Sequence, residues 1–295
     1  MRLSTVILPV YRRAEARSIW QRAEELGFHA GYTYDHLSWQ EFRDRPWFGA
    51  VPTLAGAALA TRRLRIGTLV TSPNFRHPVT LAKDLMTLDD LGEGRLTVGI
   101  GSGGTGFDAS VLGHQPWSAR ERTDRFGEFL RLLDRLLTQP STTETGTHYA
   151  AVEARMIPGC VQQPRPPFLV AAAGGRGFAL TAELGQGWVT YGDPGRPDAG
   201  PAEQALDVVR TQLEGLEEAC AARGRDAKTV DKVLLTGLTA EQPLVSVEAF
   251  VDWAGPYGEL GFSELVLHWP VPDSRFATDP ELFERVVTEG APQLG

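Results

Sequence analysis

A histidine follows the second predicted strand, where it could move a proton. His36 comes shortly after an apolar run at 30–33 and directly after Asp35. Imidazole exchanges a proton near neutral pH, which suits a general acid or base. We therefore predict that His36 is catalytic and that Asp35 holds one nitrogen of its ring. The alternative is a histidine satisfied by Asp35 within a packed loop. A metal site is not predicted, because the two neighbours point apart and no further ligands share their spacing.

Glycines follow the fourth predicted strand. The segment GIGSGG at 99–104 matches the G-x-G-x-x-G pattern of dinucleotide-binding folds. That pattern normally opens a helix at once and is followed, about 20 residues later, by an acidic residue that ends the next strand. Here a loop continues, and the region near 120–124 is helical. We therefore interpret Gly101, Ser102 and Gly103 as backbone that comes close to a flat ring or a phosphate.

A second glycine-rich turn, AAAGGRG at 171–177, lies between a buried strand and a helix. Free backbone N–H groups and the helix dipole make such a turn an anion site, to which an arginine adds a fork of donors. The alternative is an ordinary turn with a solvated arginine. We predict that a cofactor phosphate binds here, through Ala173, Gly174, Gly175, Arg176 and Gly177.

Eight strand-like runs must position these residues. They are predicted near 3–8, 30–33, 65–69, 96–100, 168–172, 187–190, 232–237 and 264–268. Helical stretches follow them near 14–26, 49–61, 78–91, 118–137, 176–184, 201–223, 246–260 and 279–290. This alternation predicts a closed (β/α)₈ TIM barrel, in which the loops after the strands build the site. We expect a single domain over 1–295.

Two stretches interrupt the alternation. Residues 138–167 are rich in Thr, Pro and Gly and too long for an ordinary connection, so we expect a loop excursion over the barrel. Residues 192–201 read GDPGRPDAGP and are expected to form a mobile loop near the barrel mouth.

Composition limits the class of protein. The 295-residue chain has 42% hydrophobic residues and a net charge of -8, so neither nucleic acid nor an anionic membrane is an expected partner. Cys160 and Cys220 are the two cysteines and form no metal-binding pattern, which fits a reducing cytoplasm. No apolar run is long enough to span a membrane or to form a signal peptide.

Several motifs together resemble those of the luciferase-like monooxygenase family, whose members use FMN or the deazaflavin coenzyme F420. They cover nearly the whole chain. The motifs are AEELGF at 23–28 leading to Asp35 and His36, LRIGTLV at 64–70, RHP at 76–78, LAK at 81–83, LD at 88–89, GR at 94–95, VGIG at 98–101, GTHY at 146–149, QPRPP at 163–167, AAAGGR at 171–176 and GW at 187–188.

The resemblance implies a cofactor ring at the end of the third strand and a phosphate at Gly174 to Gly177. It also implies a cis peptide between Leu69 and Val70, and cofactor contacts from Asp35, Leu69, Val70 and Thr71. His36 occupies the active-site histidine position. Two positions depart from the family pattern. Gly104 stands where the deazaflavin-dependent sugar-phosphate dehydrogenases have a glutamate, which puts that chemistry in doubt, and Gln186 replaces an aspartate.

Three functions fit this resemblance. The first is hydride transfer between reduced F420 or FMN and a small organic substrate, with His36 handling the proton. The second is an FMN-dependent monooxygenase that uses oxygen and a partner flavin reductase. The third is a non-catalytic flavin-binding subunit, which His36 and the intact phosphate turn disfavour. The sequence leaves the choice between F420 and FMN, the substrate and homo-oligomer formation open.

Overall fold

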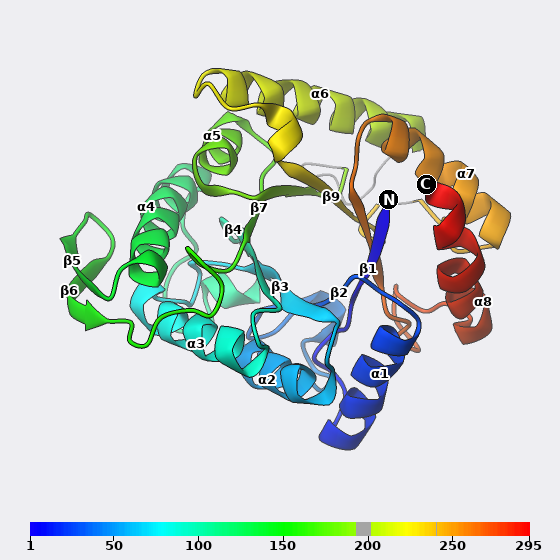
Figure 1. Ribbon diagram of the computed structural model, residues 1–295, viewed down its shortest axis with the longest axis horizontal. Coiled ribbons are helices and arrows are strands. Elements are labelled where there is room, and N and C mark those ends of the chain that lie inside the picture. Colours follow the sequence, from blue (N-terminus) through cyan, green and yellow to red (C-terminus); the bar gives the residue numbers. More distant parts are fainter. Residues whose placement is uncertain (193–201, 240) are drawn as a thin grey trace.

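Eight parallel strands close into a barrel (Figure 1). The computed structural model describes residues 1–192, 202–239 and 241–295. Around the barrel the strands follow one another as β1-β10-β9-β8-β7-β4-β3-β2, so that β2 also pairs with β1. The barrel strands are β1 (Arg2–Val6), β2 (Ala30–Thr33), β3 (Arg65–Thr71), β4 (Leu96–Gly101), β7 (Phe168–Ala171), β8 (Gly187–Thr190), β9 (Asp231–Leu235) and β10 (Glu264–His268). The predicted TIM barrel and all eight predicted strands are confirmed.

Helices follow the strands and surround the barrel (Figure 1). They are α1 (Arg13–Glu25), α2 (Ala50–Ala60), α3 (Pro78–Leu91), α4 (Ala119–Thr138), α5 (Gly175–Leu184), α6 (Ala202–Ala221), α7 (Val247–Glu259) and α8 (Pro280–Arg285). The last continues as a π-helical turn (Val286–Gly290) and a short 3₁₀ turn (Ala291–Leu294). Three more 3₁₀ turns are Gln40–Phe42, Phe107–Ala109 and Ala227–Thr229. In the ranges that the structure describes, no helix is long and apolar enough to cross a membrane.

The barrel interior is a packed core, not a pore. Apolar side chains from the strands fill it, among them Val6, Leu169, Val189, Val233 and Val266. Because this core closes the middle of the barrel, a ligand can enter only at an end, and the loops at the carboxyl ends of the strands have room to hold it.

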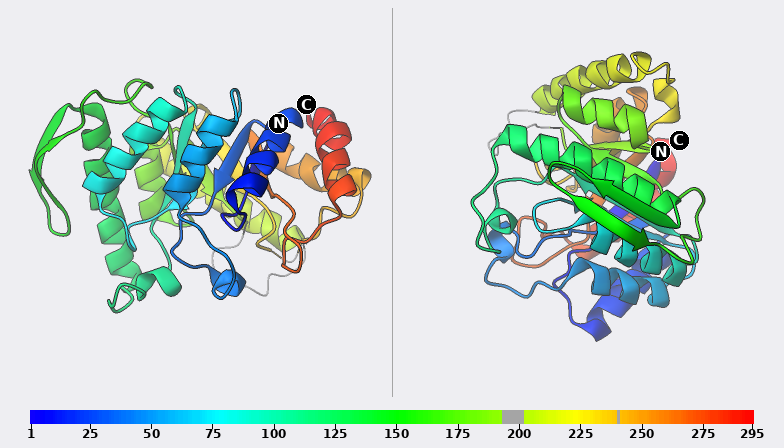
Figure 2. Two further views of the ribbon diagram at one scale, coloured as in Figure 1. Left: turned by 90° about the horizontal axis from the view of Figure 1, so that it is seen from below. Right: turned by 90° about the vertical axis from the view of Figure 1, so that its left-hand side faces the viewer.

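The excursion at 138–167 was wrongly predicted to lie over the barrel. It forms an antiparallel hairpin of β5 (Ser141–Thr145) and β6 (Ala150–Arg155), which lies against the outside of α4 (Figure 2). Glu128 on α4 fixes the turn, because its carboxylate accepts hydrogen bonds from the backbone N–H groups of Thr147, His148 and Tyr149 at 2.6–3.1 Å. The polar character of the segment therefore reflects a hairpin on the outer helix layer. The other predicted loop falls, after Gly192, outside the described residues.

Gln186 takes over a structural role near the amino-terminal ends of β7 and β8. Its Oε1 accepts hydrogen bonds from the backbone N–H of Phe168 at 2.9 Å and from Arg165 Nη1 at 3.0 Å. Arg165 is buried, stacks on the Phe168 ring and pairs with Asp134. The amide oxygen thus supplies the acceptor that a carboxylate would supply, which explains why the departure from the family pattern is tolerated.

Gln186→Leu should lower the free energy of unfolding by about 1 kcal/mol, because the N–H of Phe168 loses its acceptor beside a buried guanidinium. Urea denaturation of both proteins measures the difference. Gln186→Glu retains the acceptor oxygens and serves as the control. Equal stability of the leucine variant and the wild type would contradict this role.

Candidate functional site

A cavity of about 560 Å³ opens at the carboxyl ends of the strands. This is a typical volume for a site that holds a cofactor-sized ligand. His36 lies at its wall, and apolar side chains and backbone form much of the rest. The predicted cofactor residues that line it are Leu69, Val70, Gly101, Ser102, Gly103 and Ala173.

The glycines in the last part of β4 and directly after it serve different purposes. Gly103 has φ +72°, and a Cβ there would lie 2.5 Å from Asn74 Oδ1, so only glycine fits. A Cβ on Gly99 would lie 2.2 Å from the carbonyl oxygen of Thr68, so this glycine lets β3 and β4 approach each other. Gly99 therefore serves the packing of the strands, while the predicted residues Gly101 and Gly103 line the cavity together with Gly104.

The end of β3 has the backbone that the resemblance implied. The Leu69–Val70 peptide is cis, which confirms that prediction, and the pairing of β3 with β4 shifts register between Thr68 and Thr71. Both residues of the cis peptide line the cavity. The irregular strand end thus presents backbone to the ligand space.

Asp35 does not hold His36, and this prediction was wrong. Its buried carboxylate accepts hydrogen bonds from Thr71 Oγ1 at 2.6 Å and from Arg76 Nε and Nη2 at 3.0 and 2.6 Å. Neither Asp35 nor Thr71 lines the cavity, and their polar groups bond to each other. The hydrogen bond between Asp35 and Thr71 holds the end of β3 in place. The two side chains can therefore act on a ligand only indirectly, through the position of β3.

Asp108 orients His36 instead. One of its carboxylate oxygens bonds to His36 Nδ1, and the other accepts the backbone N–H of Leu37 at 2.7 Å. Asp108 is buried, whereas the His36 side chain is 29% exposed. A carboxylate on Nδ1 favours the tautomer with its proton there, which leaves Nε2 to accept or donate a proton in the cavity.

No local feature of the sequence indicates this partner. Asp108 lies 72 residues from His36, in the 3₁₀ turn Phe107–Ala109 after β4. The usable signal was topological, because carboxylates in loops at the carboxyl ends of strands converge on one mouth. Asp35 is the carboxylate next to His36 in the sequence and was therefore predicted to hold its ring. Adjacent side chains on an extended segment, however, point to opposite sides.

His268, the other histidine near the mouth, is a poor proton carrier. Its ring stacks on Phe276 with centroids 3.8 Å apart, and Nε2 lies 2.8 Å from the hydroxyl of Tyr34. Burial lowers the pKa of His268 to about 3, so the imidazole stays neutral throughout the neutral range. Burial also raises the pKa of Tyr34 above its usual value. Of these two histidines, His36 is therefore the candidate for proton exchange.

A second cavity, of about 330 Å³, adjoins the first at the amino end of α5. Both cavities are lined by Ser102, Ala171, Ala172 and Ala173. The second is also lined by the other four predicted phosphate residues, Gly174, Gly175, Arg176 and Gly177. Gly174 is the N-cap of α5, so the following N–H groups have no partner within the helix.

The glycines of this turn leave room for an anion. A Cβ added to Gly174 or Gly175 would meet nothing within 4 Å, whereas one on Gly177 would lie 2.6 Å from the Cβ of Ala172. Gly177 therefore permits packing, and the first two glycines expose the helix terminus. Arg176 bonds through Nη2 to Asp124 on α4, and its side chain is 57% exposed. Backbone N–H groups, more than the guanidinium, thus form the anion site.

The two cavities fit a ring cofactor that carries a phosphate. The larger has apolar walls and backbone for a ring, and the smaller has open N–H donors for an anion. Among the residues that the structure describes, no group of three or more His, Cys, Asp or Glu could hold a metal ion. The barrel and this paired cavity define an enzyme of the cofactor-binding (β/α)₈ class.

Comparisons with known proteins agree with this class. The family model of the luciferase-like monooxygenases matches residues 5–243. The chain is 34% identical over 328 residues to an F420-dependent glucose-6-phosphate dehydrogenase of Beutenbergia cavernae, covering 92% of this chain and 90% of that protein. It is 29% identical over 250 residues to 4-hydroxyprotoasukamycin monooxygenase of Streptomyces nodosus subsp. asukaensis, covering 80% and 63%.

The chain belongs to the luciferase-like monooxygenase family, and it is an oxidoreductase, as the sequence predicted. A solved structure supports the fold. An F420-dependent secondary alcohol dehydrogenase, determined with an F420-acetone adduct, superposes with a TM-score of 0.82 at 18% identity, over 100% of this chain and 99% of that chain.

Proposed function

We propose that this protein transfers hydride between the deazaflavin coenzyme F420 and a small organic substrate, in either direction, and that His36 handles the proton. The observation that carries this proposal is His36, oriented by Asp108, at the wall of a cavity that adjoins an open helix terminus. Relatives named as F420-dependent dehydrogenases support the choice of coenzyme.

Different residues of the two cavities would hold the ring, bind the phosphate and transfer the proton. Leu69 and Val70 would lie against the ring, with Gly101 to Gly103 beside it, and the turn Gly174 to Gly177 would hold the phosphate. When bound, the coenzyme supplies the hydride or accepts it. His36 Nε2 exchanges a proton with the substrate oxygen, while Asp108 stabilises the charged imidazole.

Sugar-phosphate oxidation is not the chemistry we propose. Gly104 lines the cavity where the sugar-phosphate dehydrogenases of this group have a glutamate, so that carboxylate is missing here. Arg275 is the cationic side chain among the described residues that line the cavity. It lies 3.8 Å from Glu41 and over the Trp39 ring. A small carbonyl compound or alcohol suits these walls better than a sugar phosphate.

Identification of the ligand tests the proposal. Mass spectrometry and absorbance of ligand retained by the purified protein, followed by titration with F420 and with FMN, should show F420 bound about tenfold or more tightly than FMN. Turnover is then surveyed with alcohols and carbonyl compounds. Tighter binding of FMN, with oxygen consumption when reduced FMN is supplied, would instead support a monooxygenase with a partner reductase, which the monooxygenase relative favours.

Gln212 on α6 should help to select the substrate. Thr190 Oγ1 accepts the N–H of Gly192 at 3.1 Å and donates to Gln212 Oε1 at 2.6 Å. Gln212 is 5% exposed and lines the cavity, and none of the described residues bonds to its Nε2. A buried amide donor of this kind is satisfied by an oxygen of a bound ligand.

Gln212→Leu should raise KM about threefold to tenfold for a substrate found in that survey, since one hydrogen bond is lost, and should change kcat little. Gln212→Glu keeps the acceptor for Thr190 but removes the donor, so it should show the same increase in KM. Unchanged KM in both variants, with only a lower melting temperature, would make Gln212 a structural residue.

A further inference from the structure

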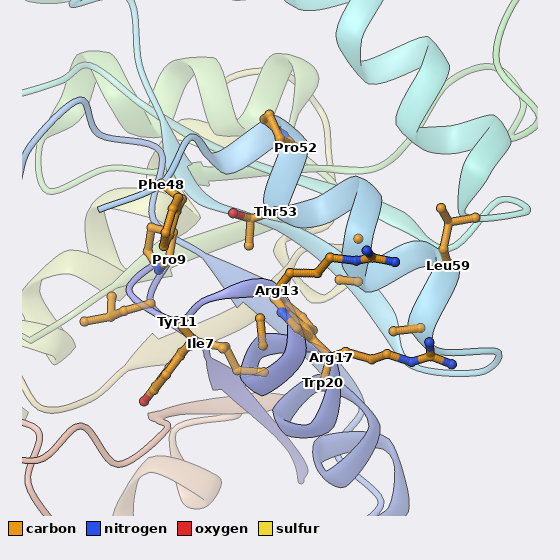
Figure 3. Close-up of a pocket in the computed structure, with 15 residues that line it drawn as sticks. Ile7, Pro9, Tyr11, Arg13, Arg17, Trp20, Phe48, Pro52, Thr53 and Leu59 are labelled. Atoms are coloured by element: carbon orange, nitrogen blue, oxygen red, sulfur yellow. The ribbon is translucent and has the colours of Figure 1, made fainter. Parts of the chain in front are cut away.

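A further cavity lies outside the barrel, between α1 and α2. The cavity measures about 390 Å³, and none of its lining residues lines the cofactor cavities. Its walls are mostly apolar, with Ile7, Trp20 and Ala57 buried at the bottom. The rim includes Phe48 and Leu59, which are 43% and 73% exposed (Figure 3).

Two arginines stand at one side of this cavity. Arg13 and Arg17 are one turn apart on α1 and extend in the same direction, beside Leu59 of α2 (Figure 3). No ion pair or hydrogen bond of either side chain occurs within residues 1–192, 202–239 and 241–295. Two guanidinium groups without a partner in this part of the chain therefore stand next to apolar walls.

Trp20, at the bottom of this cavity, carries a buried hydrogen-bond donor. Trp20 is 1% exposed, and its Nε1 has no hydrogen-bond partner among the residues that the structure describes. The six-membered ring of its indole lies against the backbone of Gly31, since a Cβ there would lie 2.4 Å from Trp20 Cζ3. The nitrogen lies on the other edge of the indole, away from Gly31.

The free polar atoms of this cavity are donors. The hydroxyl groups of Tyr11 and Thr53 donate to the carbonyl oxygens of Pro270 and Gly49, at 3.0 and 2.9 Å. What remains accessible to a ligand is the pair of guanidinium groups of Arg13 and Arg17. We propose that this is a binding site for an amphipathic small molecule with an apolar body and one anionic head, such as a medium-chain carboxylate. The body lies on the apolar walls and the head bonds to the arginines.

Calorimetric titration of the purified protein with octanoate, octanol and octylammonium tests the proposal. Octanoate should bind at one site per chain, about tenfold or more tightly than octanol, because charge-assisted hydrogen bonds are added. Octylammonium should not bind. The double variant Arg13→Gln/Arg17→Gln should lose this preference for octanoate while octanol binds as before. Arg120→Gln/Arg210→Gln removes the same two charges from α4 and α6, at side chains that are 89% and 56% exposed, and is the charge-matched control.

A cavity-filling variant locates the site. A Cβ on Gly56 of α2 meets nothing within 4 Å, so Gly56→Phe should fold, fill the cavity and abolish octanoate binding. Gly255→Phe places the same side chain on an equally open glycine of α7 and should bind octanoate normally. The proposal is overturned if octanoate fails to saturate, or if Gly56→Phe binds it unchanged. It is also overturned if sedimentation shows a dimer that Gly56→Phe dissociates, since a second copy would then cover this face.

Discussion

His36→Asn should slow turnover by about 10²- to 10⁴-fold, the usual worth of a positioned acid or base. Asparagine keeps a polar side chain of similar size next to Asp108 but cannot exchange a proton near neutral pH. Folding and coenzyme binding should change little, because no backbone contact of the cavity depends on the imidazole. Single-turnover oxidation or reduction of the coenzyme, from pH 5.5 to 8.5, measures the effect. The wild-type rate should show an inflection that the variant lacks.

A companion variant separates catalysis from packing. Asp108→Asn keeps an acceptor for the N–H of Leu37 but offers an amide donor to Nδ1 of His36, so the opposite tautomer is favoured. It should slow turnover and displace the inflection, while His36→Asn abolishes it. His268 cannot replace His36 in this test, since its pKa of about 3 lies below the whole range. Wild-type rates and pH profile in His36→Asn would assign His36 to packing.

The fold could be predicted because its signals are local. Each barrel strand is a short apolar run and each helix carries its own period, so all eight strands were found to within a few residues. The hairpin β5–β6 was missed because its strands are largely exposed and polar, and an exposed two-stranded sheet has little apolar alternation. Its position is set by Glu128 on α4, a contact between distant residues.

The candidate site was predictable only in part, for the same physical reason. The turn Gly174 to Gly177 lies at a helix start and is visible in the chain as a strand, glycines and a helix. The partner of His36 comes from another loop, and Asp35 bonds to Thr71 and Arg76, up to 41 residues further on. Which carboxylate orients a histidine depends on the three-dimensional arrangement of strand ends, and adjacency in sequence is a poor guide to it.

Gly175→Leu should weaken coenzyme binding about tenfold to a hundredfold. A side chain at this position would project into the open space at the amino end of α5, where a phosphate would otherwise reach the free N–H groups, and the charge-assisted hydrogen bonds would be lost. The melting temperature of the coenzyme-free protein should be unchanged or slightly higher, since a helical glycine has been replaced. Fluorescence titration with the coenzyme and a thermal melt without it measure the two effects.

Gly177→Ala gives the opposite pattern and so serves as the control for Gly175→Leu. Its methyl group would lie 2.6 Å from the Cβ of Ala172, so α5 must shift, and the melting temperature of the coenzyme-free protein should fall. The comparison separates a glycine that is needed for packing from one that leaves room for an anion. Wild-type affinity in Gly175→Leu would refute a phosphate site at this helix terminus, because no phosphate could approach these N–H groups past a leucine without loss of contact.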